Sequence, residues 1–312
     1  MKAVIFHQYG SPDVLQYTEV AKPSPTPEQL LIKVFASSIN PIDWKIRRGM
    51  LRVVTGNKFP LFLGSDFSGE VIEVGTNLTN FNIGDQVYGF VKPNSGGAYG
   101  EYLVTTPQFI SPKPNNLNYS QAAAVPLAAS TALQALRDQA NIKNGQKVLI
   151  NGASGGVGTF AVQIAKAYQT EVTAVCSSKN IPLVQQLGAD HVIDYTQEDF
   201  TKNGQQYDII FDAVSNRSFS ACKNSLRSQG VYITLLPSSQ LIIDNILAFF
   251  SSKQVKFLLA ETKPQDLAEL TRLIEQGQIT PIIDRTYNLS EIIAAHTYSE
   301  EGHAVGKIVI EI

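Results

Sequence analysis

The sequence predicts an α/β protein of two domains, a β-rich barrel or sandwich and a doubly wound parallel sheet. Three observations indicate this. Short β-type runs punctuated by Gly, Pro and Asn fill residues 1 to about 120, apolar strands then alternate with helices, and a glycine-rich turn joins one strand to its helix. A chain of 312 residues is long enough for two domains.

The composition excludes several classes of protein. Hydrophobic residues make up 44% of the chain and charged residues 17%, which supports a packed core and argues against disorder. A net charge of -2 argues against a nucleic-acid partner. With only Cys176 and Cys222, neither a disulfide framework nor a four-cysteine metal site can form. No signal peptide or transmembrane run is visible, so we expect a cytoplasmic protein.

The β-rich domain is predicted from the runs KAVIFHQ, LLIKVFA, EVIEVG, DQVYGF and EYLVTT. One helix should interrupt it, because Pro41 suits a first helical position and Gly49 suits a stop. Near the other end of the chain, a helix (PQDLAELTRLIEQG) precedes two β-type runs, PIIDRTY and GKIVIEI, which resemble those of the first half. We therefore expect this domain to comprise residues 1–120 and 262–312.

The second domain is expected over residues 121–261. It opens with a helical stretch that breaks at Pro126. The runs KVLING, EVTAVC, HVIDY, YDIIFDAV and VYITLL then alternate with helix-like segments, and their continuous apolar character is typical of parallel strands covered on both faces. The run QVKFLLA would be an exposed sheet edge, which predicts a homodimer through pairing with a second copy.

The strongest motif is the glycine-rich turn in KVLINGASGGVGTFAVQIAKAY. A buried strand ends at Asn151, and a helix begins near Gly156. Ala153, Gly155 and Gly158 align with the three glycines of the dinucleotide fingerprint, with Ala153 replacing the first. Gly155 lets the backbone approach a pyrophosphate, and the helix N-terminus offers free N–H groups. The alternative is a tight turn that permits close packing without a ligand.

A second interpretation overlaps this turn. Gly152 to Gly156 also fits G-x-S-x-G, the nucleophile elbow of α/β-hydrolases, which would need a downstream acid and a histidine such as His191, His296 or His303. The additional glycines and the late position of the motif favour the nucleotide.

The type of nucleotide depends on the end of the next strand, EVTAVC. Ser177, Ser178 and Lys179 follow it and no carboxylate does, whereas an NAD site usually places an acidic residue there. Hydroxyl and ammonium groups bind a 2′-phosphate, and Tyr195 at the end of HVIDY can add a phenol. The sequence therefore favours NADPH, although Lys179 can equally be a solvated residue and Tyr195 an ordinary strand-end aromatic.

Zinc ligands are scarce. The first 120 residues contain no cysteine, and His7 is their only histidine. A catalytic zinc site takes three protein ligands of the Cys, His or carboxylate type. We therefore expect hydride transfer without zinc, promoted by hydrogen bonds, positive charge and positioning.

Taken together, the motifs resemble a known family. They occur in order along the whole chain and are SSINPIDWKIRRGM, FPLFLGSDFSGEVIEVG, NFNIGDQVYGF, GAYGEYLV, QAAAVPLAASTALQAL, NGASGGVG and GHAVGKIVI. They resemble the zinc-independent quinone oxidoreductase branch of the medium-chain dehydrogenases/reductases, with NPIDWKI and CSSKN most similar to its chloroplast-envelope and alkenal/one reductase members. The resemblance implies a GroES-like β-barrel domain, a Rossmann domain and NADPH-dependent reduction of α,β-unsaturated carbonyls or quinones.

The resemblance also implies roles for individual residues. Asn40, Asp43 and Lys45 lie in the family's NPxDWK element, which faces the nicotinamide and is expected to be catalytic. The residues expected at the cofactor are Lys45, Thr131, Gly155, Gly156, Val157, Ser177, Ser178, Lys179, Tyr195, Asp212, Ala213, Leu235, Leu236 and Lys307. The Gly-His-Glu element of the zinc branch is here Gly64-Ser65-Asp66, so no metal ligands are expected.

Some alternatives remain open at this level. Asp43 can simply cap its helix, and Lys45 can be a solvated helix residue. The whole chain can be a noncatalytic NADP-binding redox sensor, or a zinc-free reductase of enoyl thioesters or alcohols. No residue of the sequence stands out as an obligatory proton donor.

Overall fold

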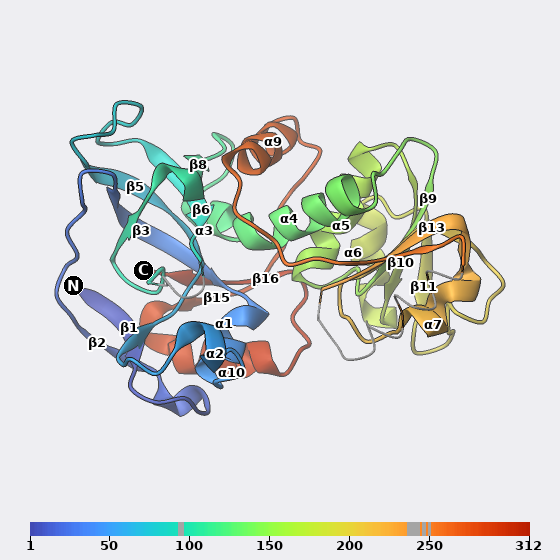
Figure 1. Cartoon of the computed structure of the whole chain (residues 1–312), viewed down its shortest axis with the longest axis horizontal. Helices are drawn as coiled ribbons and strands as arrows, with labels where there is room; N and C mark the ends of the chain where they lie inside the picture. The colour runs from blue at the N-terminus through green and yellow to red at the C-terminus, as the bar shows by residue number, and fades with distance from the viewer. Residues whose placement is uncertain (93–96, 236–243, 245–247, 249–250) are drawn as a thin grey trace. The chain divides into compact units, whose positions relative to one another are not determined.

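The computed structural model describes residues 1–92, 97–235, 244, 248 and 251–312 (Figure 1). These residues form two compact units. Unit 1 contains Met1–Ser130, Thr262–Gly277 and Pro281–Ile312, and unit 2 contains Thr131–Glu261 and Gln278–Thr280. The first division falls within helix α4 (Pro126–Leu133).

Unit 1 is built on two sheets. The smaller sheet has the order β2-β1-β4, and the larger has the order β15-β16-β3-β5-β6-β8, with β7 also paired to β3. The strands are β1 (Lys2–Phe6), β2 (Gln16–Glu19), β3 (Leu30–Ile39), β4 (Leu61–Phe62), β5 (Asp66–Val74), β6 (Gln86–Phe90), β7 (Tyr102–Thr105), β8 (Ile110–Pro112), β15 (Ile283–Asn288) and β16 (Lys307–Glu311). Strand β3 is buried along most of its length and pairs antiparallel with β16, β5 and β7.

The helices of unit 1 begin and end at the expected signals. Pro41 begins α1 (Pro41–Arg47), Asn40 and Asp43 form its capping box, and Gly49 follows it with φ +77°, which confirms the predicted helix. The predicted break at Pro126 is also confirmed, because α3 ends at Ala123 and α4 begins at Pro126. The other helices are α2 (Arg52–Thr55), α3 (Tyr119–Ala123), α9 (Pro264–Glu275), α10 (Ile292–Glu300) and short 3-10 turns at Pro12–Val14, Pro107–Phe109 and Leu289–Glu291.

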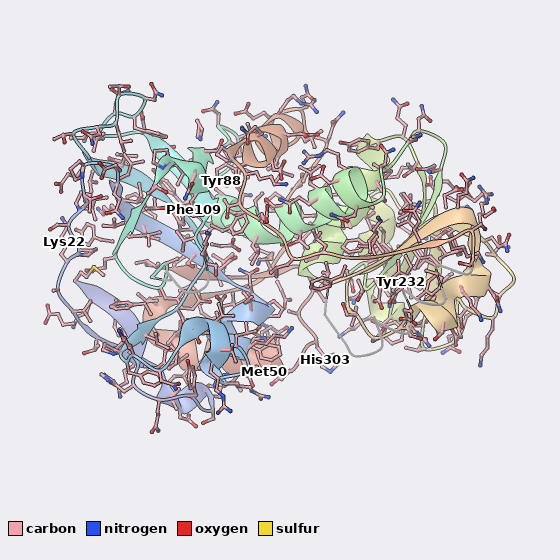
Figure 2. The ribbon with its side chains drawn as sticks, in the orientation of Figure 1. Lys22, Met50, Tyr88, Phe109, Tyr232 and His303 are labelled. Carbon is pink, nitrogen blue, oxygen red and sulfur yellow. The ribbon has the colours of Figure 1, made fainter. Side chains whose placement is uncertain are left out.

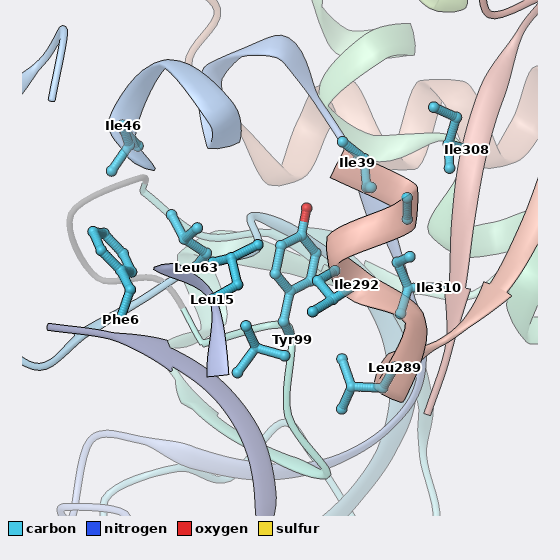
Figure 3. Packing of buried hydrophobic residues seen from close by; sticks show 12 residues of the cluster. Phe6, Leu15, Ile39, Ile46, Leu63, Tyr99, Leu289, Ile292, Ile308 and Ile310 are labelled. Carbon is cyan, nitrogen blue, oxygen red and sulfur yellow. The ribbon is translucent and has the colours of Figure 1, made fainter. Parts of the chain in front are cut away.

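Strand β16 returns to the first half of the chain. It pairs antiparallel with β3, so that Ile308 lies opposite Ile39, and parallel with β15. Its side chains join a core cluster around Tyr99 that also contains residues of α1 and α10, shown in Figure 3. The buried members of this cluster are Val4, Phe6, Leu15, Ile39, Ile46, Leu63, Tyr99, Leu289, Ile292, Ala295, Ile308 and Ile310.

Unit 2 contains a parallel sheet with the order β11-β10-β9-β12-β13-β14. Its strands are β9 (Lys147–Asn151), β10 (Glu171–Cys176), β11 (His191–Asp194), β12 (Tyr207–Asp212), β13 (Leu226–Thr234) and β14 (Gln254–Phe257). Counted from β9, this is the strand order of dinucleotide-binding folds, in which the order reverses between β9 and β12. The predicted α/β class is confirmed, because a β-rich unit accompanies a doubly wound parallel sheet with the dinucleotide-binding strand order.

Helices cover both faces of this sheet. Helices α5 (Gly156–Ala167) and α6 (Ile181–Gln186) lie on one face and α7 (Phe219–Cys222) on the other (Figure 1). Leu149, Ile210 and Cys222 belong to the core on the α7 side. Short segments of π-helix (Gln134–Gln139) and 3-10 helix (Ser178–Asn180 and Lys223–Ser225) complete the unit. No helix within the described ranges is long and apolar enough to cross a membrane.

Candidate functional site

The turn after β9 depends on Gly152. Its φ is +80°, and a Cβ at this position would lie 2.1 Å from Cγ2 of Val214. The N–H groups of Gly152 and Ala153 donate to the carbonyl oxygen of Val175 at 3.2 and 3.0 Å, which closes the turn against β10. The sequence alignment assigned the first glycine position to Ala153, but the residue with the glycine conformation is its neighbour Gly152.

The other two glycines of the turn have different environments. A Cβ on Gly158 would lie 2.0 Å from the carbonyl oxygen of Gly152, so this glycine permits the close helix–strand contact. A Cβ on Gly155 would meet nothing nearer than 3.5 Å. The helix begins with the hydrogen bond from Thr159 N–H to Gly155 C=O, so the amides of Gly156 and Val157 lie before its first intrahelical bond. The open backbone and these amides fit a phosphate group.

Asp212 ties the strand ends next to this turn together. Its Oδ1 accepts hydrogen bonds from Asn151 Nδ2 at 2.8 Å and from the Ser215 N–H at 2.9 Å. Its Oδ2 accepts from the Arg217 N–H at 2.9 Å and from the hydroxyl of Tyr232, labelled in Figure 2, at 3.1 Å. The carboxylate is fully buried, so it holds the backbone of the loop after β12 in place.

The other residues predicted at the nicotinamide half are Thr131, Ala213, Leu235 and Leu236. The N–H of Ala213 donates to the carbonyl of Asn151 at 3.1 Å, and the N–H of Leu235 donates to Ser215 Oγ at 3.0 Å. Thr131 is buried within α4. Leu236 lies outside the residues that the structure describes.

The predicted 2′-phosphate residues gather where β10 and β11 end. Cys176 and Asp194 are paired in the register of these parallel strands, and Tyr195 N–H donates to the carbonyl of Cys176 at 3.1 Å. This pairing places Ser177 and Tyr195 directly after neighbouring strand ends. Ser178, Lys179 and Tyr195 are exposed, while Ser177 is half-buried.

One carboxylate at this place was missed by the sequence reasoning. Asp194 Oδ2 accepts a hydrogen bond from Ser178 Oγ at 2.5 Å, and Oδ1 accepts from the N–H and hydroxyl of Thr196 at 3.0 and 2.8 Å. The hydrogen bond from Ser178 and those from Thr196 lower the pKa of Asp194. A negative charge therefore stands beside the predicted phosphate residues. The sequence could have indicated Asp194, because HVIDY and EVTAVC are neighbouring parallel strands and such strands end at the same edge of the sheet.

In unit 1, Lys307 and Asn40 meet at the start of α1. Lys307 Nζ donates to Asn40 Oδ1 at 2.6 Å, to the carbonyl of Ile39 at 3.2 Å and to Asp66 Oδ2 at 3.4 Å. Asn40 Nδ2 donates to the same Asp66 oxygen at 2.8 Å. Three acceptors match the three N–H bonds of the ammonium, so Lys307 fixes the amide of Asn40 in this structure.

Asp66 completes this buried charge network. The exposed fraction is 3% for the side chain of Lys307 and 0% for that of Asp66. Asp66 also accepts hydrogen bonds from the hydroxyl of Ser38 at 2.7 Å and from the N–H of Leu127 at 2.8 Å. A buried ion pair is tolerated only when further hydrogen bonds satisfy its atoms, and this pair has them. No sequence motif indicated this role for Asp66.

Asp43 is buried beneath the first turn of α1. Its Oδ2 accepts hydrogen bonds from the N–H of Asn40 at 2.8 Å and from the hydroxyl of Tyr99 at 3.0 Å, and Ser65 Oγ lies 3.4 Å from Oδ1. Figure 3 shows the ring of Tyr99 standing among apolar side chains. Burial raises the pKa of Asp43 to about 7. Through its hydrogen bond with the N–H of Asn40, the carboxyl group therefore positions Asn40 and the first turn of α1.

Lys45, on the same helix, is only half-buried. Burial lowers the pKa of its ammonium group. The part of the chain that the structure describes offers Nζ a single partner, the ring of Trp44, whose centroid is 5.5 Å away. Unlike Lys307, Lys45 thus keeps N–H donors for an anionic or carbonyl group.

Within the described ranges, no group of three or more His, Cys, Asp or Glu side chains is arranged to hold a metal ion. At Gly64-Ser65-Asp66, the carboxylate of Asp66 is occupied by the donors named above.

Comparison with known proteins adds to this geometry. Residues 26–115 match the alcohol dehydrogenase GroES-like domain, and residues 187–310 match the family described as zinc-binding dehydrogenase. The chain is 35% identical to the chloroplast envelope quinone oxidoreductase homolog of Arabidopsis thaliana, covering 100% of this chain and 98% of that protein. It is also 35% identical to the mitochondrial NAD(P)H oxidoreductase RTN4IP1 of Homo sapiens, covering 100% of this chain and 89% of that protein.

Solved structures that resemble this chain include quinone oxidoreductases as well. The quinone oxidoreductase of Coxiella burnetii is 36% identical with a TM-score of 0.93, covering 100% of this chain and 99% of that chain. The Escherichia coli quinone oxidoreductase complexed with NADPH is 25% identical with a TM-score of 0.88, and each chain is covered completely, at 100%. The resemblance found in the sequence is thereby confirmed. The chain belongs to the quinone oxidoreductase branch of the medium-chain dehydrogenase/reductase superfamily.

Proposed function

We propose that this protein is an oxidoreductase that uses NADPH to reduce the activated double bond of an α,β-unsaturated carbonyl compound or a quinone, without zinc. The observation that carries the proposal is the open turn between β9 and α5. It offers an unobstructed backbone at Gly155 and free amides at Gly156 and Val157. It also lies where the strand order of the parallel sheet reverses.

In unit 2, each predicted residue has a proposed role in holding the cofactor. The amides of Gly155, Gly156 and Val157 bind the pyrophosphate. Ser177, Ser178, Lys179 and Tyr195 bind the 2′-phosphate, with Lys179 supplying the positive charge. Thr131, Ala213, Leu235 and Leu236 contact the nicotinamide half, and Asp212 holds the loop backbone there rather than binding directly.

In unit 1, the proposed chemistry depends on α1. NADPH, when bound, supplies the hydride for the β-carbon of the acceptor. Negative charge then develops on the acceptor's carbonyl oxygen, and the ammonium of Lys45 stabilises it, before water protonates the α-carbon. Asn40 offers its amide to cofactor or substrate, and Asp43 and Lys307 act by positioning Asn40.

The relatives' names support this chemistry. The Escherichia coli structure is named as a complex with NADPH, and a 2-methylene-furan-3-one reductase of Solanum lycopersicum is 31% identical over 99% of this chain and 79% of that protein. We further propose residues 1–120 and 262–312 as the catalytic domain, residues 121–261 as the NADPH-binding domain, and a homodimer formed through β14. The predicted cytoplasmic location stays a prediction, because two of the relatives, those of Arabidopsis thaliana and Homo sapiens, are named as chloroplast-envelope and mitochondrial proteins.

The experiment is an assay of NADPH oxidation with methyl vinyl ketone, long-chain enones and quinones, using protein treated with a chelator and checked for residual zinc. Turnover of enones or quinones by zinc-free protein is the expected result. Calorimetry with NADPH is run in parallel. Tight binding without turnover of any acceptor would favour a noncatalytic redox sensor, and turnover restricted to saturated ketones or acyl thioesters would favour the alcohol or enoyl-thioester reductase.

A further inference from the structure

Three large apolar side chains stand in solvent just after α1. The exposed fraction is 63% for Met50, 96% for Val53 and 68% for Val54. Val53 and Val54 belong to α2, and Figure 2 labels Met50 at the surface of unit 1. Isolated exposed apolar residues are common, whereas several close together are typical of an interaction site. We call Met50, Val53 and Val54 the exposed tip.

The residues next to the exposed tip are held in place by hydrogen bonds and apolar contacts. The hydroxyls of Tyr9 and Thr55 are hydrogen-bonded at 2.8 Å, and Tyr9 also donates to the carbonyl of Gly56. The ring of Phe59 lies 5.2 Å from that of Tyr9, and Leu51 packs against the core cluster around Tyr99. Because Leu51 and Phe59 already fill the inward positions, the side chains of the exposed tip are directed away from the core.

The charged residues near the exposed tip in the sequence are all basic. Residues 44–65 contain Lys45, Arg47, Arg48, Arg52 and Lys58 and no acidic residue, in a chain whose total is 25 basic and 27 acidic residues. Arg47 and Arg48 pair with Glu300. Arg52 and Lys58 are exposed, and neither has an ion-pair partner within the described ranges. Two uncompensated positive charges therefore flank the apolar side chains.

We propose that the exposed tip is a docking site for an anionic membrane surface, into which Met50, Val53 and Val54 insert while Arg52 and Lys58 contact lipid phosphates. Binding at a membrane surface strengthens with the apolar area inserted and with attraction of basic residues to anionic lipids, and the exposed tip has both features. A second protein chain fits less well, since three side chains cover far less than the ~800 Å² per partner of a stable interface. We expect this docking without bound nucleotide.

The test is co-sedimentation of the full chain, without nucleotide, with vesicles of phosphatidylcholine or of phosphatidylcholine with phosphatidylglycerol. We expect binding to the anionic vesicles that weakens as salt is raised. Arg52→Glu with Lys58→Glu should lower the partition coefficient at least tenfold, because each basic residue near such a surface contributes roughly a factor of five. Val53→Asp should have a comparable effect.

Ile83→Asp is the matched control, because Ile83 is also a β-branched residue of unit 1 and its exposed fraction is 71%. It introduces the same charge away from the exposed tip and should leave binding within about twofold of the unchanged protein. Val53→Trp should show a blue-shifted fluorescence when anionic vesicles are added. Absence of binding to anionic vesicles, equal binding to both vesicle types, or equal effects of Val53→Asp and Ile83→Asp would each overturn the proposal.

Discussion

Asp194 accepts a hydrogen bond from the hydroxyl of Ser178, and so places a carboxylate at the edge where the 2′-phosphate of NADPH is proposed to bind. The sequence favours NADPH because no acidic residue follows β10. The neighbouring strand β11 supplies one nonetheless, by its parallel register with β10. We therefore expect cofactor preference to depend on a balance between Lys179 and Asp194.

We expect Asp194→Asn and Lys179→Ala to shift this preference in opposite directions. Removing the carboxylate relieves its repulsion of the 2′-phosphate and should raise the ratio of NADPH to NADH affinity about threefold or more, a modest effect because the site is exposed. Lys179→Ala should lower NADPH affinity about tenfold with little change for NADH. Calorimetry with both cofactors measures the two ratios. Lys143→Ala, an exposed lysine before β9, should change neither; equal losses for both cofactors in Lys179→Ala would contradict the assignment.

Gly155→Ala and Gly158→Ala should separate cofactor binding from folding. A methyl on Gly155 meets no atom within 3.4 Å and its φ of -82° suits alanine, so the variant should keep its melting temperature and lose NADPH affinity. A methyl on Gly158 clashes with the Gly152 carbonyl, which should cost about 2 kcal/mol or more of stability. Thermal unfolding and NADPH titration of both variants are the measurements. Unchanged NADPH affinity in well-folded Gly155→Ala would show that no phosphate binds at this turn.

Lys307→Met should be strongly destabilising. The charge of Asp66 would stay buried without its cation, and breaking a buried pair in this way costs about 3–5 kcal/mol. Urea unfolding provides the measurement. Lys33→Met, an exposed lysine on β3 of the same sheet, should change stability by less than about 0.5 kcal/mol. Adding Asp66→Asn to Lys307→Met should recover part of the loss, and a strictly additive double variant would argue against coupling of the two groups.

Asp43 should make stability fall as pH rises. Its pKa is about 7 in the folded protein against 3.8 for an ordinary Asp, so between these values the native state holds a proton that the unfolded state releases. The contribution is full below pH ~4 and is lost as pH rises to ~7, with an upper bound of about 4 kcal/mol. Asp43→Asn keeps an acceptor for Tyr99 and removes the titration. The difference in unfolding free energy between the two proteins, measured from pH 4 to 8, should change in this window; a constant difference would refute the assignment.

His296 should make stability fall as pH is lowered, opposite to the effect of Asp43. It is fully buried, its ring lies 5.7 Å from that of Tyr99, and neither ring nitrogen has a hydrogen-bond partner among the described residues. Burial, with a contribution from Arg47, lowers its pKa from 6.5 to about 3. Between these two pKa values the unfolded chain is protonated at His296 and the native state is not. The free energy of unfolding therefore falls by about 1.4 kcal/mol per pH unit as pH drops below ~6.5. His296→Leu should remove this slope, as measured by urea unfolding at successive pH values; an unchanged slope would place the acid sensitivity elsewhere.

Most helices and strands were predictable from residues that act on the backbone locally. Pro41, Gly49 and Pro126 each act on the backbone within a few residues, so α1 and the break before α4 were predictable. The apolar runs from KVLING to QVKFLLA were predictable as strands because parallel strands covered on both faces need no alternation. Helix α10 was not predicted. Its apolar residues do not mark one face, since Ile292 and Ala295 are buried while Ile293 is exposed, and helices are recognised by a single apolar stripe.

The site was less predictable than the fold. The turn was found from its spacing, but the left-handed backbone at Gly152, one residue before the fingerprint position Ala153, was not, because φ is not visible in sequence letters. The pairings of Lys307 with Asn40 and of Ser178 with Asp194 join residues from different strands. Such pairs depend on strand register, which is set by the packing of whole sheets. The sequence therefore indicated candidate site residues, whose roles stay predictions, but not which of them touch each other.

The pairing of β16 with β3 has a consequence for how the chain folds as it leaves the ribosome. Strand β3 is made early, but its partner β16 is made only after every strand of unit 2. Domains generally fold as units during synthesis, so the nascent Rossmann sheet can form while the first sheet still has an open edge and an unneutralised Asp66. Chaperone dependence in the cell should accordingly arise from the earlier half of the chain, which waits longest for its last strand.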